Sequence, residues 1–170
     1  MFSVIVPVPP AVRDLARELR PALTGFDRIR PARSRRLVLK RLPADDRREY
    51  LEAARRAKRV LAETAPFEVR ITGTGVFRDP PRGPAPVAYL AVESEGLQRA
   101  HERLVEEFDA VAGLEGADYV PHLTLARGGP HDAPAALTER DVDPISFTAS
   151  KLDCYDSEHT ERVESIQLSA

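Results

Sequence analysis

The chain has 170 residues, of which 42% are apolar and 31% are charged, and this composition is typical of a globular protein rather than a disordered one. No run approaches the ~20 apolar residues that a membrane-spanning helix needs, and the proline-interrupted amino terminus lacks the basic lead of a signal peptide. The single cysteine, Cys154, excludes an internal disulfide bond. We therefore predict a soluble, cytoplasmic protein, long enough for one domain with a substantial core.

Hydrophobic spacing predicts alternating strands and helices, with one strand pair in the middle of the chain. The strands are short and the connections between several of them are tight, which favours antiparallel pairing. We predict an α+β fold in which residues 1–170 form a single two-lobed domain. Its two pseudo-symmetric lobes of antiparallel sheet carry helices on their outer faces and leave a groove between them. In chain order, the expected strands are 2–9, 35–42, 67–77, 86–94, 119–127, 145–157 and 161–169, and the expected helices are about 10–25, 45–61, 97–113 and 135–140.

The net charge of −2 hides a strong asymmetry between the two ends of the chain. Residues 1–60 contain 16 Lys and Arg against 7 Asp and Glu, a balance of +9, whereas residues 61–170 contain 9 against 20, a balance of −11. The basic residues gather between 28 and 41 with no acidic residue among them. Such a stripe suits phosphate, although taken alone it is better explained as a solvated loop in an arginine-rich chain.

One short segment of the chain occurs twice. The sequences RLVLKR (36–41) and HLTLAR (122–127) align without a gap, so that both leucines and the final arginine match. Side chains at i and i+2 of a strand share a face, so His122 and Thr124 point together to one side while the two leucines point into the core. The earlier copy has Arg36 and Val38 at the equivalent positions.

The segment PHLTLAR, late in a chain of this length and element order, resembles the second motif of the two-histidine (2H) phosphoesterase superfamily. The most similar branch contains RNA 2′,3′-cyclic phosphodiesterases and 2′-5′ RNA ligase-like proteins. Members of that family carry two HxT motifs that face each other across a groove. The resemblance implies a metal-independent phosphodiesterase without a cofactor, acting on RNA ends or nucleotides that carry 2′,3′-cyclic or 2′-5′ phosphodiesters.

By this resemblance, His122 is an acid/base residue, Thr124 a phosphate ligand and Arg127 a support for the phosphate. On a regular strand Arg127 faces the leucine side, so this role requires the chain to leave the strand at the glycine turn. The first motif is degenerate, because Arg36 stays protonated and cannot serve as a base. Arg36 and Lys40 share the face of the missing histidine, and we expect them to form a positive clamp for phosphate.

Other interpretations remain open at this stage. The alignment of the first motif is shifted if His101, His131 or His159 completes the pair, although His101 is expected at the edge of the core and the other two in solvated loops. Tyr119 is either a base-stacking residue or an ordinary strand aromatic. The protein is alternatively a non-catalytic RNA or nucleotide phosphate-binding module on the same fold, or an unrelated α+β ligand-binding or oligomerisation domain in which the HxT triplet is accidental.

Overall fold

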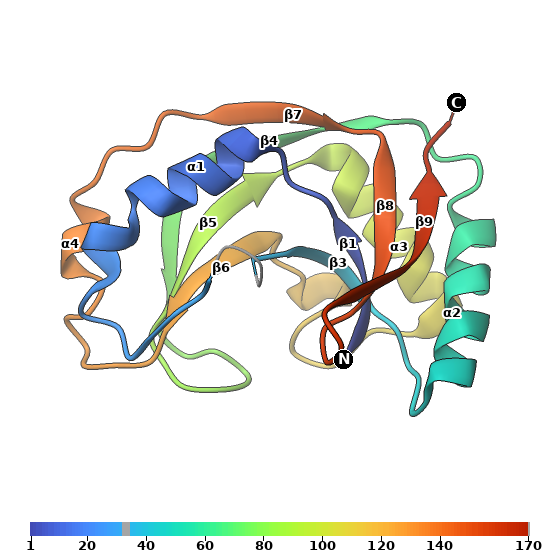
Figure 1. Cartoon of the computed structure of the whole chain (residues 1–170), viewed down its shortest axis with the longest axis horizontal. Helices are drawn as coiled ribbons and strands as arrows, with labels where there is room; N and C mark the ends of the chain where they lie inside the picture. Colours follow the sequence, from blue (N-terminus) through green and yellow to red (C-terminus); the bar gives the residue numbers. More distant parts are fainter. Residues whose placement is uncertain (32–34, 170) are drawn as a thin grey trace.

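A computed structural model of the chain describes residues 1–31 and 35–169 (Figure 1). The expected alternation of strands and helices is confirmed, and its elements are more finely divided than the sequence indicates. The strands are β1 (Phe2–Val6), β2 (Arg28–Ile29), β3 (Leu37–Arg41), β4 (Phe67–Phe77), β5 (Val87–Glu93), β6 (His122–Arg127), β7 (Ile145–Ala149), β8 (Lys151–Asp156) and β9 (Glu161–Gln167). The helices are α1 (Pro10–Glu18), α2 (Arg47–Val60), α3 (Glu95–Phe108) and α4 (Ala135–Thr138), with short 3₁₀ turns η1 (Arg20–Leu23) and η3 (Gly116–Asp118).

All strands of the described residues belong to one antiparallel sheet that curls strongly (Figure 1). Their order is β7-β4-β5-β6-β3-β1-β8-β9, with β2 added beside β6. The sheet therefore consists of two four-stranded halves that meet where β6 pairs with β3, and that junction holds a single residue pair, Leu37 with Leu123. This arrangement confirms the predicted α+β fold with two similar lobes.

Helices cover the outer faces of the sheet and bury one apolar stripe each. In α1 the buried residues are Val12 and Ala16, one helical turn apart, and in α3 they include Leu97 and Leu104. Figure 1 shows α1 and α4 together at one end of the molecule and α2 and α3 together at the other. Among the described helices, none is both long and apolar enough to cross a membrane.

The start of α2 shows why its sequence forms a helix at that point. The Asp46 side chain accepts a hydrogen bond from the Glu49 amide (2.9 Å), and the Glu49 side chain accepts one from the Asp45 amide (2.8 Å). The pair differs from a standard capping box, because Glu49 bonds the amide of Asp45, the residue before the N-cap, rather than the amide of Asp46 itself. Asp46 is thus the N-cap of a helix that begins at Arg47, close to the predicted start.

Two predicted elements are corrected. The single strand expected over 145–157 is divided at Ser150 into β7, which pairs with β4, and β8, which pairs with β1 and β9. The chain therefore passes at Ser150 from the edge of one half of the sheet into the other half. The strand β2, which lies within the basic stripe, is absent from the predicted set.

Candidate active site

The two copies of the repeated segment lie side by side at the junction of the lobes. Their Leu37 and Leu123 are equivalent in the repeat and pair with each other in antiparallel orientation, which places an approximate twofold axis between them. The four leucines of the two copies are fully buried. The residues on the opposite face line a cavity of about 300 Å³, and they are Arg36 and Val38 from the first copy and His122 and Thr124 from the second.

Both copies contain a β-bulge at the same position of the repeat. Along β1, Val4 pairs with Lys40 and Ile5 with Val38, so Leu39 has no partner on that strand. Along β5, Ala88 pairs with Ala126 and Tyr89 with Thr124, so Leu125 has none. A bulge adds one residue and reverses the faces of the residues that follow it. The repeat therefore extends to backbone irregularities that no short sequence pattern reveals.

The bulge in β6 directs Arg127 into the cavity. A regular strand would point this side chain to the leucine side, as the sequence alone indicates. Instead Ala126 is fully buried and Arg127 lines the cavity that contains His122. Its Nη1 donates a hydrogen bond to the Arg82 carbonyl (2.6 Å), in the loop between β4 and β5.

The bulge in β3 has the opposite consequence for Lys40, and the predicted position of Lys40 in a phosphate clamp is wrong. Lys40 is 1% exposed and is not among the residues that line the cavity. Its Nζ donates to Glu115 Oε2 (2.6 Å) and to the Arg41 carbonyl (2.7 Å). Arg41 faces the cavity in its place, as the repeat equivalent of Arg127.

His122 has a defined tautomer in this environment. Its Nδ1 lies 2.7 Å from the Val120 carbonyl, an acceptor, so Nδ1 carries the proton and Nε2 keeps a free lone pair when the ring is neutral. Burial lowers the pKa of His122, and the charges of Arg41 and Arg127 lower this pKa further, although the bond to Val120 acts in the opposite direction. The ring is therefore predominantly neutral near pH 7.

An aromatic pair packs beside the His122 ring. Phe77 and Tyr89 stack on each other with centroids 4.1 Å apart, and both present edge contacts to His122, at 5.0 and 5.6 Å. Tyr89 lies across Gly75, where an added side-chain carbon would come within 2.4 Å of the Tyr89 ring. These apolar rings contribute to the desolvation of the imidazole.

The cavity wall is strongly positive. Four arginines line it and, in the part of the chain that the structure describes, no Asp or Glu does. Arg36 donates to the Tyr155 hydroxyl (2.6 Å) and lies over the Tyr155 ring (4.0 Å). The hydroxyl of Ser3 is buried in the same wall and has no hydrogen-bond partner among the described residues. The four arginines are Arg30, Arg36, Arg41 and Arg127.

The connection from α3 to β6 holds β3 in place where the two copies diverge. Tyr119 donates its hydroxyl proton to the Val38 carbonyl (2.8 Å), and the buried His101 bonds through Nδ1 to the Leu39 carbonyl (2.7 Å). His101 Nε2 accepts a hydrogen bond from the Gly116 amide (3.0 Å), and the His101 and Tyr119 rings stack at 3.7 Å. Both nitrogens of His101 are thus occupied within the protein.

None of the three alternative histidines lines the cavity. His101 is completely buried, His131 is exposed and its carbonyl accepts a hydrogen bond from Arg78, and His159 is exposed and bonds to Asp156 (2.6 Å) in the β8–β9 turn. The alignment that places Arg36 and Val38 at the first motif therefore has no competitor among the described histidines of this cavity. In the described residues, no group of three His, Cys, Asp or Glu side chains is arranged to hold a metal ion.

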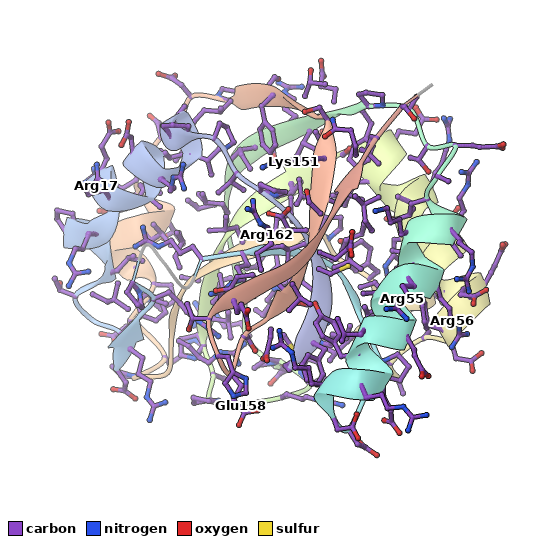
Figure 2. All side chains as sticks on the ribbon, turned by 45° about the vertical axis from the view of Figure 1, so that its right-hand side comes forward. Arg17, Arg55, Arg56, Lys151, Glu158 and Arg162 are labelled. Atoms are coloured by element: carbon purple, nitrogen blue, oxygen red, sulfur yellow. The ribbon has the colours of Figure 1, made fainter. Side chains whose placement is uncertain are left out.

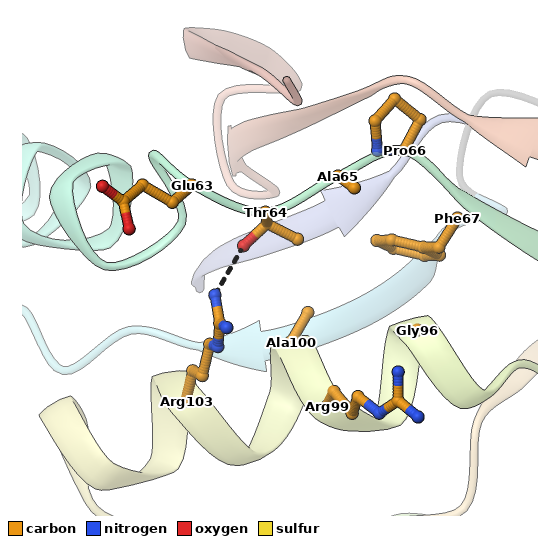
Figure 3. A pocket seen from close by; sticks show the side chains of 9 residues that line it. All are labelled: Glu63, Thr64, Ala65, Pro66, Phe67, Gly96, Arg99, Ala100 and Arg103. Carbon is orange, nitrogen blue, oxygen red and sulfur yellow. Dashed lines mark hydrogen bonds between the residues drawn. The ribbon is translucent and has the colours of Figure 1, made fainter. Parts of the chain in front are cut away.

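A separate hollow, also of about 300 Å³, lies between α3 and the segment before β4, away from the His122 cavity (Figure 3). Two arginines border it, but both have partners: Arg103 donates to Thr64 Oγ1 (3.2 Å) and Arg99 pairs with Glu95. The remaining wall includes the apolar Phe67 and Ala100. No histidine lines this hollow, in contrast to the His122 cavity.

Comparison with known proteins agrees with this geometry. A family model described as the 2′-5′ RNA ligase superfamily matches residues 37–161, which include the second copy of the repeat and all of the first copy except Arg36. The chain belongs to this superfamily. A protein of Geobacillus kaustophilus that is named as a phosphoesterase is 25% identical over 130 residues, which cover 76% of this chain and 70% of that protein.

Two solved structures have the same fold as this chain. Escherichia coli LigT in complex with 3′-AMP superposes with a TM-score of 0.71 at 13% identity, covering 99% of this chain and 98% of that one. TT0787 of Thermus thermophilus gives a TM-score of 0.66 at 23% identity, covering 91% of this chain and 87% of that one. At these identities the likeness shows the fold alone, and the superfamily membership supports a general phosphodiesterase role.

Proposed function

We propose that this chain is a metal-independent phosphodiesterase that opens 2′,3′-cyclic or 2′-5′ phosphodiesters on RNA ends or nucleotides. The observation that carries the proposal is a neutral His122 with a fixed tautomer beside Thr124, in a cavity that arginines line and from which acidic residues of the described chain are absent. A desolvated imidazole with a free Nε2 suits a general base, and the guanidinium groups suit a phosphoryl group that gains negative charge.

The proposed step uses His122 in its neutral form. The oxygen of a water molecule bonds to phosphorus while His122 Nε2 takes a proton from that water, and one bond between phosphorus and a ribose oxygen breaks. The released ribose oxygen takes a proton from solvent, and the products are a phosphomonoester and a free hydroxyl. Thr124 and the neighbouring arginines bind the phosphoryl oxygens. Complexes of LigT with 3′-AMP and with phosphate support a phosphate ligand for this fold.

The first copy of the repeat, which contains β3, distinguishes this protein from a symmetric two-histidine enzyme. Arg36 stands where a second imidazole would donate a proton to the leaving oxygen, and it cannot perform that transfer. The absence of one acid/base partner costs about 10²–10⁴ in rate, so we expect slow or specialised turnover. The same substitution favours a second candidate function, a nucleotide-binding module that uses Arg36, His122 and Thr124 only to bind phosphate.

Turnover of adenosine 2′,3′-cyclic phosphate distinguishes these functions. We expect measurable release of the monophosphate by the wild type, and a fall of about 10²-fold or more for His122→Ala, because the base is removed. His131→Ala is the matched control, since it removes an exposed histidine that does not line the cavity. Equal rates for the wild type and His122→Ala, with nucleotide still bound, would leave the binding module as the correct function.

Restoring the first motif tests the alignment itself. The double substitution Arg36→His with Val38→Thr places an imidazole and a hydroxyl across the twofold axis from His122 and Thr124. We expect turnover of the cyclic nucleotide to rise by up to about 10²-fold, because the leaving oxygen regains an internal proton donor. Val38→Thr alone supplies the hydroxyl without the imidazole and serves as control. No gain in the folded double variant would count against the equivalence of the two strands.

A further inference from the structure

A second cavity adjoins the one that contains His122. It has a volume of about 550 Å³, lies along β2 and shares two lining residues, Arg30 and Arg127, with the His122 cavity. The two hollows therefore meet at this pair of guanidinium groups. The other residues that line the second cavity are Asp27, Arg28, Ile29 and Pro31.

Backbone contacts hold both arginines at this boundary. The Arg30 amide donates to the Leu125 carbonyl (2.8 Å), which extends the pairing of β2 with β6 by one residue. The Arg127 Nη1 donates to the Arg82 carbonyl. Gly83 makes this approach possible, because its φ is +75° and a side-chain carbon there would lie 2.7 Å from Arg127 Nη1. The position of Arg127 is thus fixed by a neutral backbone group.

Neither guanidinium forms an ion pair with an acidic side chain within the described residues. Burial lowers the pKa of Arg127, and the nearby charge of Arg30 lowers it further. Arg41 differs from both, since Glu115 lies 3.7 Å from its Nη1. Two neighbouring like charges that no carboxylate pairs with directly leave a positive potential that an anionic ligand would neutralise.

The charge of the proposed substrate is too small for this wall. A cyclic phosphodiester carries a single negative charge, whereas four arginines line the cavity that contains His122. Two of them, Arg30 and Arg127, lie where this cavity meets the second one, so they are placed to bind a second anionic group. Deeper in the second cavity the charges of Asp27 and Arg28 oppose each other, whereas Arg30 and Arg127 add to one another, so the favoured position for an anion lies at the boundary between the two hollows.

We propose that Arg30 and Arg127 form a subsite for a second phosphate of the substrate. The preferred substrates then carry a phosphate on the 5′ side of the same ribose whose 2′ or 3′ oxygen bears the phosphate at His122, as in a 5′-phosphorylated nucleotide or an RNA end. A nucleoside with a cyclic phosphate alone occupies only half of the charged wall. This inference rests on the proposed function and specifies the substrate class of the same site.

The test compares adenosine 2′-phosphate with adenosine 2′,5′-bisphosphate by isothermal titration calorimetry at low ionic strength. Both are product-like, so the measurement requires no turnover. We expect the wild type to bind the bisphosphate at least about tenfold more tightly, and Arg30→Ala to reduce that ratio by about tenfold, since a hydrogen bond to a charged group contributes on that scale. Arg30→Lys should restore part of the ratio. Arg55→Ala removes an exposed arginine from α2 (Figure 2) and should retain the full ratio.

Three results would overturn the subsite. Equal affinity of the wild type for both ligands would show that the 5′ phosphate makes no contact. An equal loss for both ligands in Arg30→Ala would assign Arg30 to the phosphate at His122 or to general attraction. A loss of ratio in Arg55→Ala as large as in Arg30→Ala would show only long-range electrostatics. Failure to bind either ligand would instead refute the proposed function, from which the subsite follows.

Discussion

Removal of the Lys40 side-chain charge tests the reassignment of this residue from the phosphate site to the interior. Lys40 and Glu115 form an ion pair in which each side chain is 1% exposed, with 2.6 Å between Nζ and Oε2. Breaking a buried pair by removing one partner costs about 3–5 kcal/mol, because the other charge stays buried. In Lys40→Met, Glu115 keeps its hydrogen bonds from the Val111 and Arg41 amides. We therefore expect a loss of about 3 kcal/mol, or about 6–12 °C in Tm for a chain of this size.

Lys58→Met is the matched control for that experiment. Lys58 also pairs with a glutamate, Glu164, at 2.9 Å, but these side chains are 54% and 35% exposed. Such a surface pair contributes less than about 1 kcal/mol. Urea unfolding followed by circular dichroism, at pH 7, suits a chain that has no tryptophan. A Lys40→Met loss no larger than that of Lys58→Met would refute the assignment of Lys40 to a buried ion pair.

The effect of Lys40→Met on the free energy of unfolding should also depend on pH below neutrality. Burial alone would raise the pKa of Glu115, but the bonds from Lys40 and from the Val111 and Arg41 amides lower this pKa in the wild type. A carboxyl group with a depressed pKa stabilises the fold above its unfolded pKa, and this contribution disappears as the pH falls through the folded pKa. In Lys40→Met the depression weakens. The difference in free energy of unfolding between the two proteins should therefore narrow on acidification, and a constant difference would contradict the reasoning.

Three further predictions concern the site and its supports. Because His122 must be neutral to act as a base, the kcat/KM for a cyclic nucleotide should be constant around pH 7 and fall about tenfold per pH unit on the acid side. The midpoint of this fall should lie below the ordinary histidine pKa of about 6.5, and a midpoint above 6.5 would contradict the prediction. Gly75→Ala should displace the Tyr89 ring and raise that midpoint. Gly73→Ala is the control and should leave the midpoint unchanged, because no atom lies within 4 Å of the added carbon. Equal shifts of the midpoint in both variants would exclude the aromatic contact as a cause of the low pKa of His122. Asp46→Ala should cost about 0.5–2 kcal/mol in urea unfolding through loss of the α2 N-cap, while Asp45→Ala, which keeps the cap, should cost less.

The sequence predicts the architecture well because each copy of the repeat alternates buried leucines with residues on the opposite face, a periodicity that can be recognised locally. The two leucines of each copy define a buried face, and the shared face of His122 and Thr124 follows from strand geometry without further information. The order of strands and helices then places the two copies in matching positions of two lobes. The sheet order and the superfamily match confirm the fold that these patterns predict.

The misassigned residues have a common physical cause. A bulge depends on the register against the neighbouring strand, and neither Leu39 nor Leu125 differs in sequence from an ordinary strand leucine. Strict alternation therefore places Lys40 on the cavity face, where the structure does not have it. Arg127 is predicted in the site only through a departure from the strand at the glycine turn, and it lines the cavity because of the bulge instead. The match of Arg41 to Arg127 in the repeat was the available signal for Arg41. Glu115, in a loop without periodicity, has no comparable signal.

The junction of the lobes has a consequence for the direction in which a chain of nucleotides would run. A backbone with dyad symmetry offers two opposite orientations of equal quality to an elongated ligand. Here one wall provides an imidazole and a hydroxyl, and the other a guanidinium and an isopropyl group, so the two orientations differ in energy. The divergence of Arg36 and Val38 from His122 and Thr124 thus makes the two walls of a symmetric frame different, and the proposed substrate should bind in one orientation only.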